Sequence, residues 1–139
     1  MKKHLKVIVP LLCFSLIFTA SPVNAATVTI PDTSIMAENY LSTSAKLSIS
    51  SGTATVTAQI VGKAGITTKT SIHAYLQQYK SGNWVTVEDW TSSGSTITRT
   101  ISKTHAVTKG YKYRTKAVFK AYVGNNCETK TVLSSTVSY

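Results

Sequence analysis

The sequence predicts an all-β protein that folds as a single antiparallel β-sandwich of about seven strands. Ser, Thr and Val are abundant after residue 25, and no window shows the 3.6-residue apolar period of an amphipathic helix. Several segments instead alternate apolar and polar residues, and turn residues separate them at the spacing typical of sandwiches and barrels. No segment could form a helix of crossover length, which excludes a parallel βαβ architecture.

Two strands are expected in the first half of this region. Residues 45–50 (AKLSIS) form the first, and residues 26–44 are interpreted as a loosely packed leader that could add an edge strand. Residues 53–61 (TATVTAQIV) alternate throughout, as a half-buried strand does. Their apolar face consists of Ala54, Val56, Ala58 and Ile60. The segment GKAG, residues 62–65, forms the following turn.

A β-hairpin is expected next. Its first strand is SIHAYLQQY at 71–79, and its second is WVTVEDW at 84–90. The segment KSGN at 80–83 closes the hairpin through a loop that contains glycine. One face of the first strand carries Ile72, Ala74 and Leu76, and the other carries His73, Tyr75 and Gln77.

Three further strands, at 96–102, 111–123 and 128–139, complete the expected fold. The longest of them, 111–123, separates two sets of side chains by alternation. The set that can enter a core is Tyr113, Thr115, Ala117, Phe119 and Ala121. The opposite set contains the cations Lys112, Arg114, Lys116 and Lys120 and is interrupted by Val118. This basic row is either an anion-binding stripe or the solvated face of an ordinary strand, and we favour the solvated face because long cationic side chains commonly cover such faces.

The amino-terminal segment has the order of a secretory signal peptide. Residues 1–6 (MKKHLK) are basic, residues 7–18 (VIVPLLCFSLIF) are apolar, and residues 19–25 (TASPVNA) hold small residues and a proline. The apolar run is shorter than the ~20 residues of a membrane-spanning helix. Val23 and Ala25 satisfy the small-residue rule, so we expect cleavage after Ala25 and an extracellular protein, with an uncleaved anchor as the alternative.

The composition of the expected secreted chain limits its class. Cleavage would leave 114 of the 139 residues, which suits one domain. Three of the 15 Lys and Arg precede the cut, so 12 basic residues remain against 5 acidic ones, a net charge of +7. Such a charge draws a protein to anionic surfaces, or else only maintains its solubility. Cys127, in the expected turn GNNCETK, is the only cysteine after the cut, so a disulfide scaffold is excluded.

The segments LQQYKSGNWVTVEDW (76–90) and KGYKYRTKAVFKAY (109–122) resemble a group of small secreted proteins from Gram-positive bacteria. The resemblance covers residues 45–139 and implies an immunoglobulin-like sandwich of uncharacterised function, with no catalytic or ligand residue. Cys127 departs from the pattern, since that turn usually carries a small polar residue. Tyr111 or Tyr113, after Gly110, resembles the tyrosine corner of such sandwiches, whose hydroxyl bonds to nearby backbone.

Trp84 and Trp90 form a second candidate binding feature. Their six-residue spacing gives them the same parity on a regular strand, and two exposed indoles could stack on sugar rings. We favour the alternative, in which Trp84 caps the hairpin and Trp90 fills the core, with a bulge at Val87, because large aromatic side chains usually supply buried area.

The sequence gives catalysis and metal binding little support. Adjacent Glu88 and Asp89 point to opposite faces of a strand and cannot form a facing carboxylate pair. His73 and His105 lie far apart, and no paired-Cys motif, His-Glu-x-x-His motif or phosphate-binding loop is present. We therefore expect no catalytic residue, no metal site and no cofactor, although a triad of distant residues stays open.

These observations favour a secreted, non-catalytic binding or cell-surface-associated module. The expected partner is an anionic cell-wall polymer or glycan, with no specific nucleic acid and no transmembrane segment after signal cleavage. The candidate contact residues are Lys112, Arg114, Lys116, Lys120, Trp84 and Trp90. A secreted antagonistic factor, bacteriocin-like and membrane-active, is the alternative, and a weak or cryptic enzyme is the third class.

Overall fold

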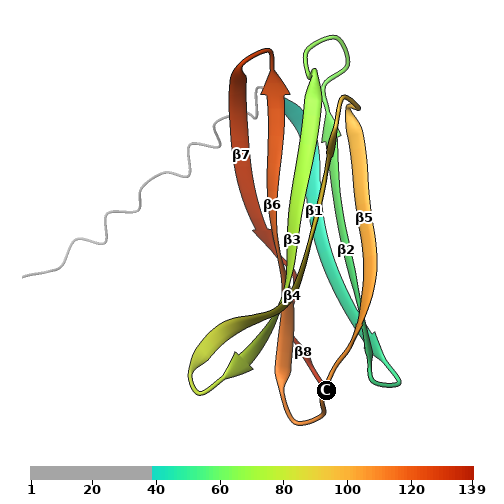
Figure 1. Cartoon of the computed structure of the whole chain (residues 1–139), viewed down its shortest axis with the longest axis vertical. Coiled ribbons are helices and arrows are strands. Elements are labelled where there is room, and N and C mark those ends of the chain that lie inside the picture. Colours follow the sequence, from blue (N-terminus) through green and yellow to red (C-terminus); the bar gives the residue numbers. More distant parts are fainter. Residues whose placement is uncertain (1–38) are drawn as a thin grey trace, which may run out of the picture. The chain divides into compact units, whose positions relative to one another are not determined.

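The computed structural model describes residues 39–139, which form eight strands in two antiparallel sheets (Figure 1). The strands are β1 Tyr40–Ser50, β2 Thr53–Gly62, β3 Lys69–Lys80, β4 Asn83–Gly94, β5 Thr98–Ala106, β6 Lys112–Val123, β7 Asn126–Leu133 and β8 Val137–Ser138. The smaller sheet has the order β1-β2-β5, and the larger has the order β4-β3-β6-β7 with β8 beside β6. The predicted signal peptide, its cleavage after Ala25 and the leader up to residue 38 lie outside the described residues.

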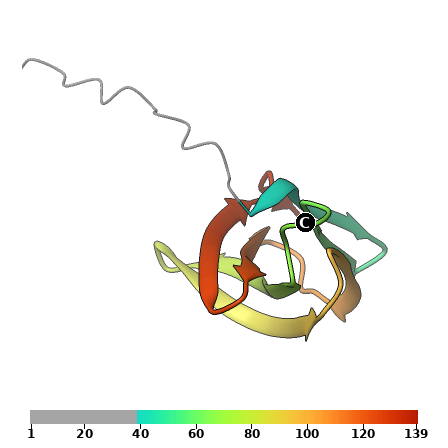
Figure 2. The ribbon, with the colours of Figure 1, turned by 90° about the horizontal axis from the view of Figure 1, so that it is seen from above.

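The two sheets face each other around one apolar core, so the prediction of an all-β, antiparallel, sandwich-like fold is confirmed. Viewed along the strands, β1 to β7 surround a common interior (Figure 2). The predicted inward sets of β2, β3 and β6 are all buried. They are Ala54, Val56, Ala58, Ile60, Ile72, Ala74, Leu76, Tyr113, Thr115, Ala117, Phe119 and Ala121. Period-two alternation was sufficient to assign these faces because every second side chain of a half-buried strand must be apolar or satisfied.

Two tight turns determine the registers of the hairpins β1–β2 and β3–β4. Ser51 and Gly52 both have positive φ, as do Ser81 and Gly82. Positive φ at both central residues defines the type I′ turn, whose twist matches that of the strands on either side. The predicted Ser-Gly hairpin at 80–83 is therefore confirmed.

The connection from β5 to β6 crosses from one sheet to the other and is closed by Tyr113. Its hydroxyl donates to the Thr108 carbonyl at 2.9 Å and accepts from the Thr108 amide at 3.1 Å and from Gln78 Nε2 at 3.0 Å. Tyr113, rather than Tyr111, thus makes the backbone bonds expected of a tyrosine corner. Thr115, also buried, donates to the Lys46 carbonyl at 3.2 Å and links β6 to β1 of the facing sheet.

Most elements differ from the prediction at their ends. β4 continues to Gly94 instead of residue 90, β5 spans Thr98–Ala106 instead of 96–102, and the last predicted strand, 128–139, is divided into β7 and β8. β1 begins at Tyr40 instead of Ala45, because backbone pairing with β2 extends to Gly62 although this segment lacks an apolar alternation. β7 begins at Asn126, so Cys127 lies in a strand opposite Tyr122 and not in a turn. Periodicity gives no signal for either extension, since backbone hydrogen bonding alone defines them.

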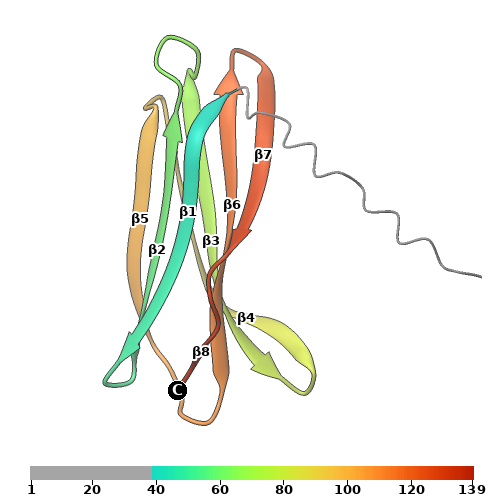
Figure 3. The same cartoon turned by 180° about the vertical axis from the view of Figure 1, so that it is seen from behind.

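The tip of the β3–β4 hairpin extends away from the remaining strands (Figures 1 and 3). A register shift between Leu76 and Gln77 of β3 marks the position where the hairpin departs from regular pairing. A bulge bends the strand that carries it and increases its local twist. The distal half of the hairpin consequently exposes Tyr79, Val85 and Val87.

Candidate functional site on the outer face of the larger sheet

The outer face of the β4-β3-β6-β7 sheet, which points away from the core, carries the basic row of β6 and several aromatic side chains. The register of β3 with β6 places Tyr79 opposite Lys112, Gln77 opposite Arg114 and Tyr75 opposite Lys116. Because side chains of directly opposite residues share a face, these pairs form successive rows across the two strands. We call this surface the outer face.

The predicted basic row of β6 lies on this face. Lys112 and Lys120 are exposed, and Arg114 and Lys116 are half-buried. Within residues 39–139, no carboxylate oxygen lies within 4.0 Å of the charged nitrogens of these four residues. The row is therefore a set of cations without acidic partners, and the shared face that alternation predicted is confirmed.

Arg114 is held in place by two contacts from neighbouring strands. Its guanidinium carbon lies 4.2 Å from the centroid of the Trp84 ring of β4. Its Nε donates to Gln77 Oε1 of β3 at 2.9 Å. Tyr79 supports the indole from the side, with ring centroids 5.2 Å apart and an interplanar angle of 56°. The contact thus spans three strands of the sheet.

Two lysines of the outer face also lie over aromatic rings. Lys116 Nζ is 5.7 Å from the centroid of Tyr75, and Lys69 Nζ is 5.2 Å from that of Tyr122. A cation over an aromatic face is attracted by the ring quadrupole. Most aromatic side chains on this face therefore support cations, which explains why Arg114 and Lys116 are only half exposed.

The prediction that Trp84 and Trp90 could share a face is wrong. The register runs from Leu76 opposite Glu88 to Gln77 opposite Thr86, so one extra residue, Val87, is inserted in β4. The bulge reverses the parity of the strand. Trp84 lies on the outer face, whereas Trp90 lies opposite buried Ala74 and packs against the core. The favoured alternative, a Trp in the core through a bulge at Val87, is confirmed, and a platform of two indoles is excluded.

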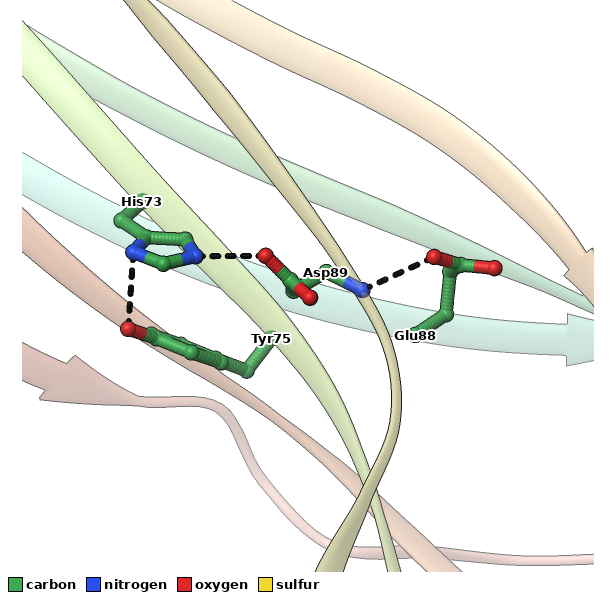
Figure 4. Close-up of polar contacts among 4 residues, drawn as sticks. All are labelled: His73, Tyr75, Glu88 and Asp89. Carbon is green, nitrogen blue, oxygen red and sulfur yellow. Dashed lines mark hydrogen bonds and ion pairs between the residues drawn. The ribbon is translucent and has the colours of Figure 1, made fainter.

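His73 of β3 forms a polar cluster with Asp89 and Tyr75 (Figure 4). Its Nε2 lies 2.6 Å from Asp89 Oδ2 of β4, and its Nδ1 lies 2.7 Å from the Tyr75 hydroxyl. The imidazole and phenol rings are stacked, with centroids 4.0 Å apart and an interplanar angle of 29°. The neutral tautomer with its proton on Nε2 donates to Asp89, and Nδ1 then carries the lone pair.

This cluster has a poor geometry for proton relay. Figure 4 shows the Tyr75 hydroxyl beneath the imidazole ring, whereas the Nδ1 lone pair points along the ring plane. The side chains of His73 and Asp89 are 37% and 51% exposed, so water screens them. A nucleophile activated by a base needs an aligned hydrogen bond, which this arrangement lacks. The cluster is therefore better suited to orienting the Tyr75 and His73 rings than to chemistry.

A shallow hollow of about 300 Å³ lies beside the cluster on the outer face. Its lining consists of Ser71, His73, Tyr75, Thr91, Val118, Lys120 and Tyr122. Hydroxyl groups, the His73 imidazole, one half-buried apolar side chain and one lysine thus surround a space open to solvent. The hollow can accept a polar, anionic group of modest size.

The second acid of the pair, Glu88, points to the other side of β4 and lies 3.5 Å from His105 Nδ1 of β5. The predicted division of Glu88 and Asp89 between opposite faces is confirmed, and each acid meets a different histidine. Among residues 39–139, no group of three or more His, Cys, Asp or Glu side chains could hold a metal ion.

Sequence reasoning missed three parts of this surface. Lys69 was not assigned to the face, Gln77 was not recognised as the partner of Arg114, and His73 was not paired with Asp89. Alternation had already placed Gln77 on the face of His73, and the same parity extended to the start of the strand would have placed Lys69 there. The contact with Asp89 had no local signal, because a regular count from the turn at Ser81 and Gly82 would place Glu88 opposite Tyr75 instead.

No protein-family profile, no curated protein and no solved structure matches this chain. In the part of the chain that the structure describes, no helix has the length and apolar character needed to cross a membrane.

Proposed function

We propose that this protein is secreted, does not act as an enzyme, and binds an anionic cell-wall polymer or acidic glycan through the outer face of its larger sheet. The observation that carries the proposal is the basic row of β6. Its members Lys112, Arg114, Lys116 and Lys120 share one exposed face and have no carboxylate partner within residues 39–139. Unpaired cations on one face create a positive potential that attracts polyanions.

We further propose that the domain is an immunoglobulin-like sandwich of the small secreted group from Gram-positive bacteria that its sequence resembles. Three features support this assignment. The first, second and fifth strands share one sheet, as strands A, B and E do in such sandwiches. The third, sixth and seventh share the other, as C, F and G do. The bonds of Tyr113 to Thr108 occur at the start of the sixth strand, where the tyrosine corner belongs.

Export is tested by the intact mass of protein recovered from culture medium. Cleavage after Ala25 would give a chain that begins at Ala26. Recovery only in the membrane fraction, with residues 1–25 attached, would show that the segment is an anchor and would refute secretion.

Binding is tested by retention of the purified secreted protein on cell walls, with and without their teichoic acid, over a salt series. Retention should weaken steeply between 0.1 M and 1 M salt, because the screening length falls from ~10 Å to ~3 Å. Replacing Lys112, Lys116 and Lys120 by Gln should abolish retention. The fold should persist, since exposed substitutions usually change stability by no more than ~0.5 kcal/mol.

The matched control replaces Lys46, Lys103 and Lys130, three exposed lysines that lie away from the outer face. Lys130, for example, lies opposite buried Phe119 in the β6–β7 register and so belongs to the other side of the sheet. The control removes the same charge. Equal loss of retention in both triple variants would show that retention depends on net charge alone. Unchanged retention after replacement of Lys112, Lys116 and Lys120 would refute binding through the outer face.

One observation favours a membrane-active, antagonistic factor as a second candidate function. The tip of the β3–β4 hairpin exposes Tyr79, Val85 and Val87 at 40%, 47% and 37% of their surface, close to Lys80. Aromatic and aliphatic groups beside cations suit the interface of an anionic bilayer. Dye release from phosphatidylglycerol vesicles, lost on Val85→Asp substitution, would favour this candidate, and intact vesicles would exclude it.

A further inference from the structure

We infer that Arg114 is a preorganised oxyanion site that takes two oxygens of one phosphodiester or carboxylate group, and that Trp84 and Gln77 position it. The inference rests on the proposed function and names the contact within the outer face that recognises the polymer. The remaining cations of the face act through their charge, whereas Arg114 acts through its geometry.

The two terminal nitrogens of Arg114 are unused. Its Nε is bonded to Gln77 Oε1, and within residues 39–139 the Nη1 and Nη2 groups have no hydrogen-bond acceptor. They are not among the buried polar atoms that lack a partner, so they retain access to solvent. The two nitrogens carry four N–H donors in one plane, and this fork matches the two oxygens of a carboxylate or phosphate.

The other described arginine shows what a structural guanidinium looks like in this fold. Arg99 of β5 donates through Nη1 to Ser92 Oγ and through Nη2 to Thr96 Oγ1, both at 2.9 Å. Its Nε is buried without a partner. Arg99 thus uses both terminal nitrogens to hold the connection between β4 and β5. Arg114 uses only its Nε, and its two terminal nitrogens have no acceptor within residues 39–139.

The orientation of Arg114 is established before any ligand arrives. The indole of Trp84 lies against one side of the guanidinium, at 4.2 Å, and Gln77 bonds its inner nitrogen. A free arginine loses much rotamer freedom when it binds, and a side chain already held in place loses less. The indole covers one side of the guanidinium, and the two terminal nitrogens that carry the donors still reach solvent.

The neighbours of Arg114 on β6 contribute electrostatic attraction but no directional, bidentate hydrogen bonding. Lys112 and Lys116 lie two residues away on either side, about 7 Å along the strand. Their ammonium groups are point charges without carboxylate partners in the described chain. A polyanion that places one oxyanion on Arg114 therefore meets a cation on each side.

The test compares affinities for two probes, poly(glycerol phosphate) and polygalacturonate, with the full secreted protein at several salt concentrations. Arg114→Lys keeps the charge and removes the fork and the contact of the guanidinium with the Trp84 ring. It should weaken binding about tenfold at every salt concentration, the scale of a lost bidentate contact. The slope of log affinity against log salt should stay the same, because the slope counts charges.

Two companion variants separate positioning from charge. Trp84→Leu should weaken binding by a similar factor, and combining it with Arg114→Lys should add little, since both remove one arrangement. Lys130→Arg is the matched control and should leave affinity within about twofold, because it exchanges one cation for another at an exposed position away from the outer face. Melting temperatures verify that each variant is folded.

The outcomes distinguish this inference from the proposed function. If the unaltered protein binds neither probe, the proposed function and the inference about Arg114 are both refuted. If it binds and Arg114→Lys binds equally well, the face binds by charge and the inference is refuted. Loss confined to poly(glycerol phosphate) identifies the ligand group as phosphodiester, and loss confined to polygalacturonate identifies it as carboxylate.

Discussion

Replacing Tyr113 by Phe should lower the free energy of unfolding by about 2 kcal/mol. The side chain is only 1% exposed, and its hydroxyl makes three hydrogen bonds, two to the Thr108 backbone and one to Gln78 Nε2. Each such bond contributes roughly 0.5–1.5 kcal/mol net. Thr108 is exposed and Gln78 is half-buried, so water can satisfy the groups that lose their partner. We therefore take a value near the lower end of the sum.

The assay is urea unfolding followed by tryptophan fluorescence. The transition midpoint should fall while its slope stays unchanged, because the surface exposed on unfolding is the same. For a domain of this size, ~2 kcal/mol corresponds to a fall in melting temperature of roughly 8–16 °C. The slope also verifies that the variant still unfolds in one cooperative step.

Tyr111→Phe is the matched control. Tyr111 precedes Tyr113 by two residues and is half-buried, but its hydroxyl has no hydrogen-bond partner in residues 39–139. This variant should unfold at nearly the same urea concentration as the unaltered protein. Equal destabilisation by the two substitutions, or none by Tyr113→Phe, would refute the reasoning that the corner hydroxyl stabilises the crossing between sheets.

Three further outcomes are expected. Gly62→Ala should destabilise the protein by ~1–3 kcal/mol in urea unfolding, because a Cβ there would lie 2.6–2.7 Å from three atoms of buried Thr67; unchanged stability would mean that Thr67 moves freely. A reducing agent should leave the melting temperature unchanged, since Cys127 is an exposed free thiol, and a large fall would reveal a bridge between chains. Burial, and then the charge of Glu128, raise the pKa of Tyr40 above its ordinary value of 10.0. The folded state therefore holds that proton more tightly, its stability falls as the pH rises above about 10, and Tyr40→Phe should reduce the fall in urea midpoint; an identical fall in the variant would contradict this.

The faces of the long strands were predictable because alternation is a local property. In β6, the sequence alone placed Tyr113 and Phe119 inward and Lys112 and Lys120 outward, and the burial agrees. The Ser-Gly turn at 81–82 was equally predictable, since glycine readily adopts the positive φ that a two-residue hairpin turn requires. Each of these features depends on a few neighbouring residues.

A bulge at Val87 was the favoured one of two alternatives for the two Trp residues, and the tertiary structure decided between them. Two features of the outer face follow from the bulge. Without the extra residue, Trp90 would lie on the outer face and Glu88 would lie opposite Tyr75. With it, Trp90 packs against the core and Asp89 reaches His73. A bulge leaves one residue unpaired and has no signature in β4 that distinguishes it from regular alternation. Counting side-chain alternation along β4 from its turn therefore assigns the residues after Val87 to the wrong face.

The all-β class, the inward and outward faces of the main strands and the shared face of the basic row could all be predicted from the sequence. The neighbours of that row depend on the tertiary structure, which places Trp84 and Gln77 at Arg114 and Tyr75 at Lys116. The same holds for the contact of His73 with Asp89. The difference comes from the range of the forces involved. Side-chain alternation is imposed residue by residue, whereas strand order, register and bulges are set by the packing of the whole domain.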